Sequence, residues 1–156
     1  MYNIGIIGAG KVGVSLGRYL LGLDYTNLVG YYSRSLYSST YAAKVTNSGK
    51  FTSIEKLVEK SNVILITTPD DQISEIWSTI SKFSIQNKIV CHCSGSLSSE
   101  IFFDISSKGA SGCSMHPILA ISSKENSYKD LSSAFFTLEG QDKAIEFFSR
   151  VLDSKR

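Results

Sequence analysis

The sequence of 156 residues has little of several features that would point to particular classes of protein. Its formal net charge is only +2, and no basic stripe is interleaved with aromatic residues, so nucleic acid is not an expected partner. No apolar run approaches the roughly 18 residues that suggest a membrane span, and the N-terminus lacks the basic lead of a signal peptide. Three cysteines without framework spacing argue against a disulfide scaffold and favour a reducing compartment, so we expect a cytoplasmic protein.

The sequence instead contains a regular alternation of short apolar runs, typical of buried strands, and amphipathic segments, typical of helices. The predicted strands are residues 3–8, 27–32, 62–68, 87–95, 109–115 and 133–140. The predicted helices are residues 11–23, 53–60, 70–83, 98–108 and 141–156. Because strands alternate with helices in a chain of one-domain length, we predict a single α/β domain. Its sheet should be doubly wound, mostly parallel and covered on both faces, as in the Rossmann fold.

Three finer predictions concern the ends and contacts of these elements. Thr52 and Glu55 form a capping box that would open the second helix. Gly13 and Gly17 lie one helical turn apart and would let the first helix approach a strand closely. Residues 116–133 show little periodicity and predict a long loop, either a functional segment or a plain surface excursion.

The segment between the first strand and the first helix, GAGKVG, fits the pattern G-x-G-x-x-G inside a β-α-β unit. Gly8 permits the tight turn, Gly10 lets the backbone approach a pyrophosphate, and Gly13 lets the helix pack on the strand. Free N–H groups and the positive end of the helix dipole favour an anion there. The alternative is an ordinary strand-to-helix turn without a ligand. The candidate cofactor-binding residues of this motif are Gly8, Ala9, Gly10, Lys11, Val12 and Gly13.

An acidic residue is missing where the second strand ends, about 20 residues after the motif. NAD-binding proteins use such an acid to hold the ribose hydroxyls. Here the strand end carries Ser33, Arg34 and Ser35, while Asp24 lies before the strand, at the wrong end of the sheet. A guanidinium flanked by two hydroxyls suits an adenosine 2′-phosphate. We therefore predict NADP as the cofactor; the alternative is a solvated turn that binds nothing.

Polar residues also follow the later strands, at the edge where open α/β sheets bind their ligands. Thr67, Thr68 and Pro69 lie at the end of the third predicted strand, and the two threonine hydroxyls suit contacts with a ribose or a phosphate. Asp70, the next residue, is at least as well explained by capping of the following helix.

The two histidines of the chain, His92 and His116, both fall at strand ends on this edge. This placement favours a polar site around the nicotinamide, with His92 and Ser94 as further cofactor contacts; a structural role for each histidine is the alternative. Cys91 and Cys93 would share one face of a strand while His92 points to the other, so no metal site is predicted. The sequence CSGS also differs from the nucleophile motif G-x-S-x-G.

Taken in order, six segments resemble the N-terminal domain of the Rossmann-like NADP oxidoreductase family, which is related to pyrroline-carboxylate reductase, prephenate dehydrogenase and the β-hydroxyacid dehydrogenases. The segments are IGIIGAGKVG, YYSRS, VILITTPDDQI, VCHCSGSLSS, SMHPILAISSK and FTLEG. The resemblance implies hydride transfer to or from a small carbonyl, imine or hydroxy compound. From the likeness to prephenate dehydrogenases, Ser96 would bind the substrate, and His116 would polarise it or transfer a proton.

The related families carry a helical C-terminal domain that supplies much of the substrate pocket and usually the dimer interface. The resemblance therefore implies that residues 1–156 form an NADP-binding domain and that the helical domain is absent from this chain. We expect the chain alone to be inactive and to form a homodimer only with that domain. Two alternatives stay open: a non-catalytic, nucleotide-sensing Rossmann module, and hydrolase or metal chemistry around His92, Cys93 and His116.

Overall fold

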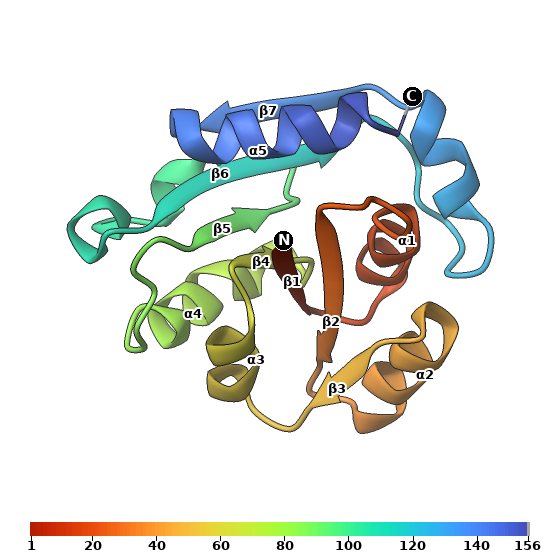
Figure 1. The fold of residues 1–156 in the computed structure, drawn as a ribbon, viewed down its shortest axis with the longest axis horizontal. Helices are drawn as coiled ribbons and strands as arrows, with labels where there is room; N and C mark the ends of the chain where they lie inside the picture. The colour runs from red at the N-terminus through yellow and green to blue at the C-terminus, as the bar shows by residue number, and fades with distance from the viewer. Residues whose placement is uncertain (156) are drawn as a thin grey trace.

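The computed structural model describes residues 1–155, which form one seven-stranded sheet in the order β3-β2-β1-β4-β5-β6-β7 (Figure 1). All neighbouring strands are parallel except β6 and β7, which are antiparallel. The strands are β1 (Tyr2–Ile7), β2 (Thr26–Tyr32), β3 (Gly49–Phe51), β4 (Val63–Ile66), β5 (Ile89–His92), β6 (Ser111–Pro117) and β7 (Phe136–Gly140). The strand order reverses between β1 and β4, and such a reversal opens a crevice at the carboxyl ends of the strands.

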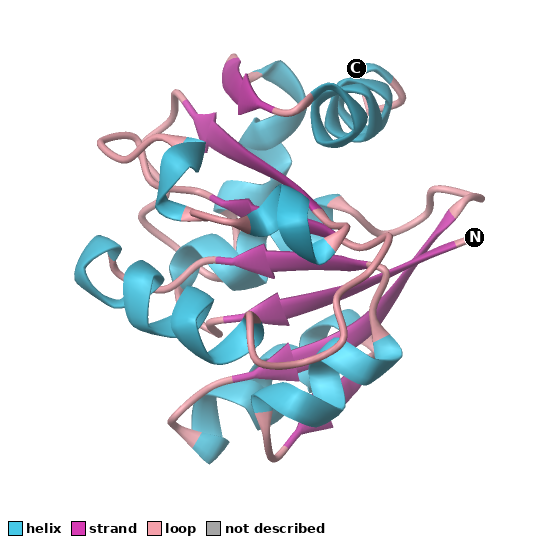
Figure 2. Ribbon diagram, turned by 90° about the vertical axis from the view of Figure 1, so that its left-hand side faces the viewer, coloured by secondary structure: helices cyan, strands magenta, loops and turns pink. Residues whose placement is uncertain are grey.

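Helices cover both faces of the sheet (Figure 2), which confirms the predicted doubly wound α/β architecture. The α-helices are α1 (Lys11–Tyr19), α2 (Leu36–Thr46), α3 (Ile54–Lys60), α4 (Asp70–Ile80) and α5 (Asp142–Asp153). One core lies under α1, α2 and α5 and contains buried side chains such as Leu16 and Phe148. The other lies under α3 and α4 and contains Leu57 and Trp77. The two cores fix the sheet between them, so the strand ends are held rigidly at one edge.

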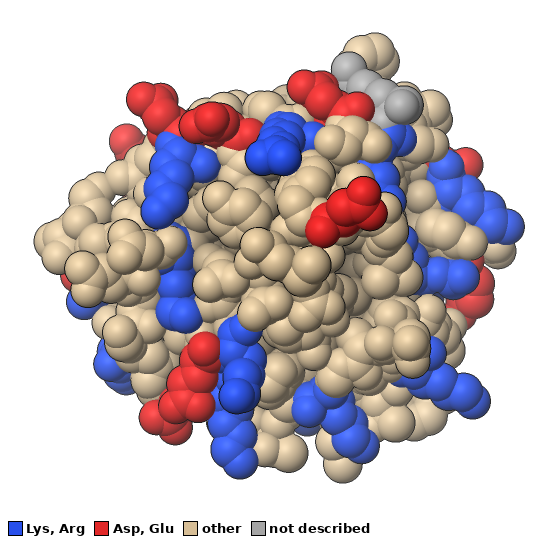
Figure 3. All heavy atoms as spheres, viewed as in Figure 1, with Lys and Arg blue, Asp and Glu red and all other residues tan. Residues whose placement is uncertain are grey.

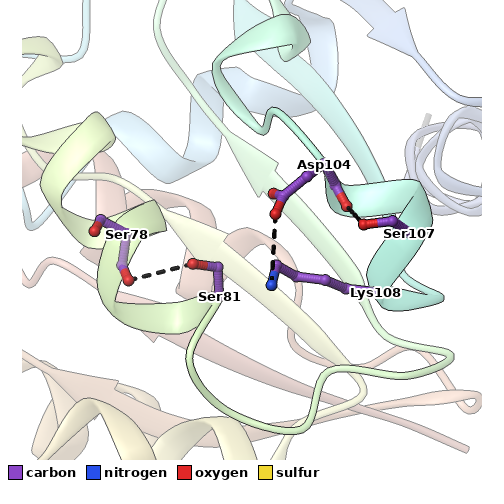
Figure 4. Close-up of polar contacts among 5 residues, drawn as sticks. All are labelled: Ser78, Ser81, Asp104, Ser107 and Lys108. Carbon is purple, nitrogen blue, oxygen red and sulfur yellow. Dashed lines mark hydrogen bonds and ion pairs between the residues drawn. The ribbon is translucent and has the colours of Figure 1, made fainter.

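Two predictions about local structure are wrong. In place of the predicted helix 98–108, the chain forms two short 3-10 turns, η1 (Ser99–Ile101) and η2 (Ile105–Lys108). Asp104 separates them in the left-handed region, with φ at 60°, which an α-helix does not tolerate. Figure 4 shows the carboxylate of Asp104 turned toward the ammonium of Lys108, at 3.5 Å.

The N-cap of α3 also differs from its prediction. Ser53, rather than Thr52, occupies that position, and its hydroxyl oxygen accepts the Lys56 N–H at 3.3 Å. The serine lies one residue later and reaches the third N–H of the helix, so the proposed pair of Thr52 and Glu55 does not form the cap.

The close approach of the first helix to the sheet is confirmed. A Cβ atom built on Gly17 would lie 1.8 Å from the hydroxyl oxygen of Tyr31 on β2, and one built on Gly13 would lie 2.1 Å from the carbonyl oxygen of Gly8. A larger side chain at Gly13 would push α1 away from the backbone of the turn after β1, and one at Gly17 would have to displace the ring of Tyr31.

The segment 116–133 is more ordered than its weak periodicity predicts. Strand β6 continues to Pro117, and the 3-10 helix η3 (Ser127–Ser133) closes the segment. The Ser15 hydroxyl donates to the carbonyl of Ser123 at 3.2 Å, and a guanidinium N–H of Arg18 donates to the carbonyl of Glu125 at 2.9 Å. These bonds hold the segment along the outer side of α1 (Figure 1).

No helix within residues 1–155 is long and apolar enough to cross a membrane. Charges of both signs are scattered over the face seen in Figure 3 rather than gathered into one continuous basic patch.

Candidate functional site

The glycine-rich turn joins β1 to α1 at the carboxyl edge of the sheet. Gly8 has φ at 113°, in a region that favours glycine, and its N–H donates to the carbonyl of Tyr32 at 2.8 Å. The Thr67 hydroxyl, at the end of β4, donates to the carbonyl of Gly8 at 3.0 Å. A Cβ atom on Gly13 would collide with that carbonyl and with Thr67 Oγ1. Gly8, Gly13 and Thr67 therefore hold the turn in shape from within the chain.

Gly10 differs from these glycines because nothing in the chain requires it. Its φ of −79° suits any residue, and a Cβ atom built on it meets no atom within 4 Å. It is the N-cap of α1, so the open space above it faces backbone N–H groups that have no partner inside the helix. The missing side chain leaves room for a group from outside the chain.

A cavity of about 240 Å³ lies between the turn, the end of β2 and the start of α4. Its lining includes Ser33 and Arg34, and the guanidinium of Arg34 is exposed and makes no hydrogen bond or ion pair within residues 1–155. Sequence reasoning missed three polar residues of the lining, Tyr32, Gln72 and Ser38, of which Ser38 belongs to the unpredicted helix α2. The cavity is lined by Ile7, Gly8, Ala9, Gly10, Tyr32, Ser33, Arg34, Ser38, Thr67, Thr68, Pro69, Gln72 and Ile76.

Ser35 does not line this cavity. It is the N-cap of α2, and its hydroxyl oxygen accepts the Ser38 N–H at 3.2 Å. The Ser33 hydroxyl oxygen accepts the Ser35 N–H at 3.3 Å, so the two serines shape the turn that presents Arg34. Helices α1 and α2 both begin at this edge without an acidic residue in their first turns, whereas α4 begins with Asp70 and Asp71.

A second cavity, of about 410 Å³, continues from the glycine-rich turn toward β5. The side chain of Thr68 lines both cavities, and its hydroxyl oxygen is buried without a hydrogen-bond partner. A buried hydroxyl without a partner is costly unless a ligand or water completes it. The second cavity is lined by Gly10, Lys11, Val12, Thr67, Thr68, Pro69, Asp70, Cys93, Ser94 and Ile121.

His92 is fully buried, and both ring nitrogens bond to the chain itself. Nδ1 accepts the Ser94 N–H at 3.2 Å, so Nε2 carries the proton and donates to the Ser98 carbonyl at 3.1 Å. Burial lowers the pKa of the imidazole below its ordinary value. The ring stacks edge-on against Phe102, on the side of the sheet opposite the cysteines, as the alternation predicted. His92 thus organises the loop after β5, and a direct contact with a cofactor stays a prediction.

His116 lies next to that loop and is half-buried. Its Nδ1 lies 3.2 Å from the Cys93 carbonyl oxygen, which can only accept, so Nδ1 carries a proton. Nε2 has no hydrogen-bond partner within residues 1–155. The ring rests on Gly95, where an added Cβ atom would lie 2.7 Å from Nε2. The histidine is therefore held by one nitrogen and leaves the other available.

Ser96 and Ser94 join Asp70 in a hydrogen-bonded group beside His116. The Ser96 hydroxyl donates to Oδ2 of Asp70 at 2.7 Å, and the oxygens of Ser94 and Ser96 lie 3.2 Å apart. Hydrogen bonds from Ser96 and then Ser94 lower the pKa of the Asp70 carboxyl, with smaller effects of His92 and His116. Asp70 thus does more than begin a helix.

The cysteines do not form a metal site with these residues. Within residues 1–155, no three His, Cys, Asp or Glu side chains gather in an arrangement that could hold a metal ion. Cys91 and Cys113 are fully buried neighbours on β5 and β6, and burial raises the pKa of Cys91 and of Cys93 well above that of a free thiol.

The fold and the glycine-rich turn together define the class of protein. Residues 1–117 match the Rossmann-like domain family, and the chain belongs to that family. None of the curated proteins compared with it matches the sequence.

Several solved structures share the fold over nearly the whole chain. A protein described as a candidate NADP oxidoreductase from Bacteroides fragilis is 18% identical, with a TM-score of 0.84 over 98% of this chain and 57% of its own. Prephenate dehydrogenase from Aquifex aeolicus is 21% identical, with a TM-score of 0.81 over 99% of this chain and 59% of its own. Plasmodium falciparum pyrroline carboxylate reductase, solved with NADP bound, is 13% identical, with a TM-score of 0.72 over 99% and 55%.

At these identities the likeness shows the fold alone. The chain spans a little over half the length of these proteins.

Proposed function

We propose that this chain is the NADP(H)-binding domain of an oxidoreductase that transfers hydride to or from a small carbonyl, imine or hydroxy compound. One observation carries the proposal: no contact within the chain requires glycine at position 10, which lines two adjoining cavities. Thr68 also lines both cavities, and its buried hydroxyl has no partner. Arg34, without a partner of its own, completes the first cavity. These residues fit a dinucleotide phosphate.

Each residue has a proposed part in holding the cofactor. The N-terminus of α1 at Gly10 would hold the pyrophosphate, and Arg34 with Ser33 and Ser38 would hold the 2′-phosphate. Thr68 would bond a ribose or phosphate oxygen. When bound, the dinucleotide supplies or accepts the hydride. Ala9, Lys11, Val12 and Pro69 would complete the walls.

The substrate side rests on Ser96 and His116, as the resemblance implied. The solved structures of similar fold are longer than this chain, so we propose that a helical C-terminal domain supplies the rest of the active site and the homodimer interface. The odd number of cysteines favours the cytoplasm as the location.

The single tryptophan, Trp77, makes the cofactor part of the proposal directly testable. Its emission overlaps the absorption of NADPH, so binding should appear as energy transfer. Gly10→Ala should cost less than about 1 kcal/mol of folding stability yet weaken NADPH binding at least about tenfold, because the added methyl occupies the approach to the backbone. Lys108→Gln, which removes a cation far from this edge, should bind as the wild type does. The proposal fails if the wild-type chain does not bind NADPH, or if Gly10→Ala binds it equally well.

A nucleotide-sensing module without catalysis is the second candidate. It is favoured by the hydrogen bonds among Ser94, Ser96 and Asp70, in which both serine hydroxyls already donate their protons within the chain. Tight NADPH binding without hydride transfer to any carbonyl or imine, in a longer protein that contains this domain, would establish it.

A further inference from the structure

Asp70, Ser96 and Ser94 form a hydrogen-bonded chain whose direction can be worked out from its contacts. The oxygen of Ser94 accepts the N–H groups of Ser96 at 3.1 Å and Leu97 at 3.2 Å, which uses both of its lone pairs. Ser94 therefore has only its proton to offer, either to Ser96 or to Asp70. Asp70 is ionised and can only accept, so the proton of Ser96 goes to Asp70 Oδ2 at 2.7 Å.

The consequence for Ser96 is the same whichever partner Ser94 chooses. Ser96 has no proton left to donate, and its oxygen keeps at least one lone pair. Ser96 is an exposed residue, so a group from outside the chain can reach that lone pair. Ser96 thus presents a hydrogen-bond acceptor to a substrate.

His116 also presents a hydrogen-bond acceptor, for a different reason. The Cys93 carbonyl fixes the proton on Nδ1, so the neutral ring has a bare lone pair on Nε2. Gly95, between Ser94 and Ser96, packs against this ring, since an added Cβ atom would lie 2.7 Å from Nε2, 2.8 Å from Cε1 and 3.0 Å from Cδ2. Because Gly95 directly precedes Ser96, the two acceptors belong to neighbouring parts of the chain, and Asp70 is bonded to one of them.

Resting on the oxidoreductase function proposed above, we propose that Asp70 is a positioning residue that makes Ser96 an acceptor. The site then selects a substrate whose reacting group carries a hydrogen-bond donor, above all an amine in its protonated form and secondarily an alcohol. A carbonyl compound offers two acceptors nothing to bind. Lys11 also lines the neighbouring cavity, but it lies at the start of α1, where the phosphates of a dinucleotide would offset its charge.

In the proposed reaction, the oxidised dinucleotide oxidises the amine or alcohol. The substrate N–H or O–H bond breaks and its proton passes to Nε2 of His116. The adjacent C–H bond breaks with its electron pair, which leaves as hydride to the oxidised dinucleotide. The substrate becomes an iminium ion or a carbonyl compound, and the reverse reaction returns both the proton and the hydride.

Three five-membered ring compounds of similar size test this selection: pyrrolidine hydrochloride, cyclopentanol and cyclopentanone. Each is titrated to about 100 mM, a range suited to such small ligands, into isotope-labelled protein with NADP⁺ present. The readouts are the amide signals of Gly95 and Ser96 and the ring nitrogens of His116. Pyrrolidine and cyclopentanol should shift these signals, with cyclopentanone at least about tenfold weaker. The His116 spectrum should show the Nδ1–H tautomer.

Asp70→Asn, with its matched control Asp71→Asn, isolates the positioning role. Asp71 is the next acid of the same helical turn, is exposed, and its carboxylate makes no hydrogen bond or ion pair within residues 1–155. Asp70→Asn should weaken pyrrolidine about tenfold and cyclopentanol less, because the amide can donate to Ser96 and no longer carries the charge. Asp71→Asn should leave both nearly unchanged.

The outcomes separate this inference from the cofactor proposal. Equal or tighter binding of cyclopentanone, equal effects of the two variants, or no shift with any of the three compounds would each overturn the acceptor arrangement, even where NADPH binds. Failure of NADPH energy transfer from Trp77 would overturn the cofactor proposal, and selective pyrrolidine binding in the same sample would still support the acceptor arrangement.

Discussion

The two halves of the carboxyl edge of this sheet differ in how many of their polar groups have hydrogen-bond partners within the chain. On the nucleotide half, Arg34 and the hydroxyl of Thr68 have no partners within the described chain, and Gly10 leaves space that nothing fills. On the half proposed to bind the substrate, Ser94, Ser96 and Asp70 bond to one another, which leaves at least one lone pair of Ser96, and Nε2 of His116, without a partner within the described residues. A buried polar group without a partner needs a hydrogen bond from a ligand or from water, whereas a group that is already bonded within the chain does not.

This difference teaches where function can be inferred from a single domain. The half proposed to bind the nucleotide supports that proposal through what it lacks: a side chain at Gly10, a partner for Thr68 and an acid beside Arg34. On the other half, most hydrogen-bond donors and acceptors already bond within the chain. That half therefore indicates only whether its remaining groups donate or accept hydrogen bonds. Four measurements can break or sharpen this contrast.

The largest effect should come from the framework that supports the nucleotide half. Gly13→Ala places a Cβ atom 2.1 Å from the Gly8 carbonyl oxygen and 2.5 Å from Thr67 Oγ1. Since both neighbours are fixed, we expect the free energy of unfolding to fall by about 3 kcal/mol. Urea unfolding followed by Trp77 fluorescence measures it. If Gly10→Ala destabilises the fold as much, the distinction between supporting and ligand-facing glycines is wrong.

The next effect should fall on cofactor choice rather than on stability. Arg34→Asp should weaken NADPH about 100-fold, because it replaces a cation with an anion where the 2′-phosphate would lie. NADH, which lacks that phosphate, should bind no worse. Arg34→Gln should give an intermediate loss and so separates lost attraction from added repulsion. Isothermal titration with both nucleotides measures the ratio, and an unchanged ratio in Arg34→Asp would show that NADP is the wrong assignment.

A smaller effect should appear in the pH dependence of stability on the substrate half. Burial lowers the folded-state pKa of His92 below its ordinary value of 6.5, so the unfolded chain binds protons first as the pH falls. The stability contributed by neutral His92 is therefore complete above that value and decreases as the solution becomes more acidic. Urea midpoints between about pH 7.5 and 5.5 should decrease in the wild type and decrease less in His92→Gln. Equal slopes would contradict a structural role for the neutral ring.

The smallest effect should lie outside both halves. Lys108→Met removes the ion pair with Asp104 (Figure 4), in which both side chains are partly exposed. We expect a change below about 0.5 kcal/mol in stability and no change in NADPH binding. A larger loss would mean that the two 3-10 turns contribute more to the fold than their exposure indicates.

The parts of the fold that the sequence predicts are those with strong periodicity. The β1-α1-β2 unit, the glycine-rich turn and the position of Arg34 follow from apolar runs and glycine spacing. Helix α2 escapes prediction because its buried residues are small or polar, including Ser39, Ala42 and Thr46, and mark no apolar stripe. Ser38 was missed for the same reason.

Other misses concern interactions that single positions decide. The left-handed backbone at Asp104 divides an apparently helical segment into two turns. The bond between Ser96 and Asp70 joins residues 26 positions apart, through the pairing of β4 with β5, and no local pattern encodes it. For the site, the sequence identifies the residue types at each strand end, while their hydrogen-bond directions require the tertiary structure.

The helices differ in the charge of their first turns, and this difference affects how a ligand approaches the site by diffusion. Helices α1 and α2 begin at this edge without acids, and Arg34 adds a positive charge, while α4 begins with two carboxylates. An anionic nucleotide diffusing from water would be turned toward the starts of α1 and α2, and a cationic amine toward the start of α4. Such steering acts within about 10 Å at 0.1 M salt. Rising ionic strength should therefore slow encounter more than it speeds release, and the two ligands would be oriented before either is bound.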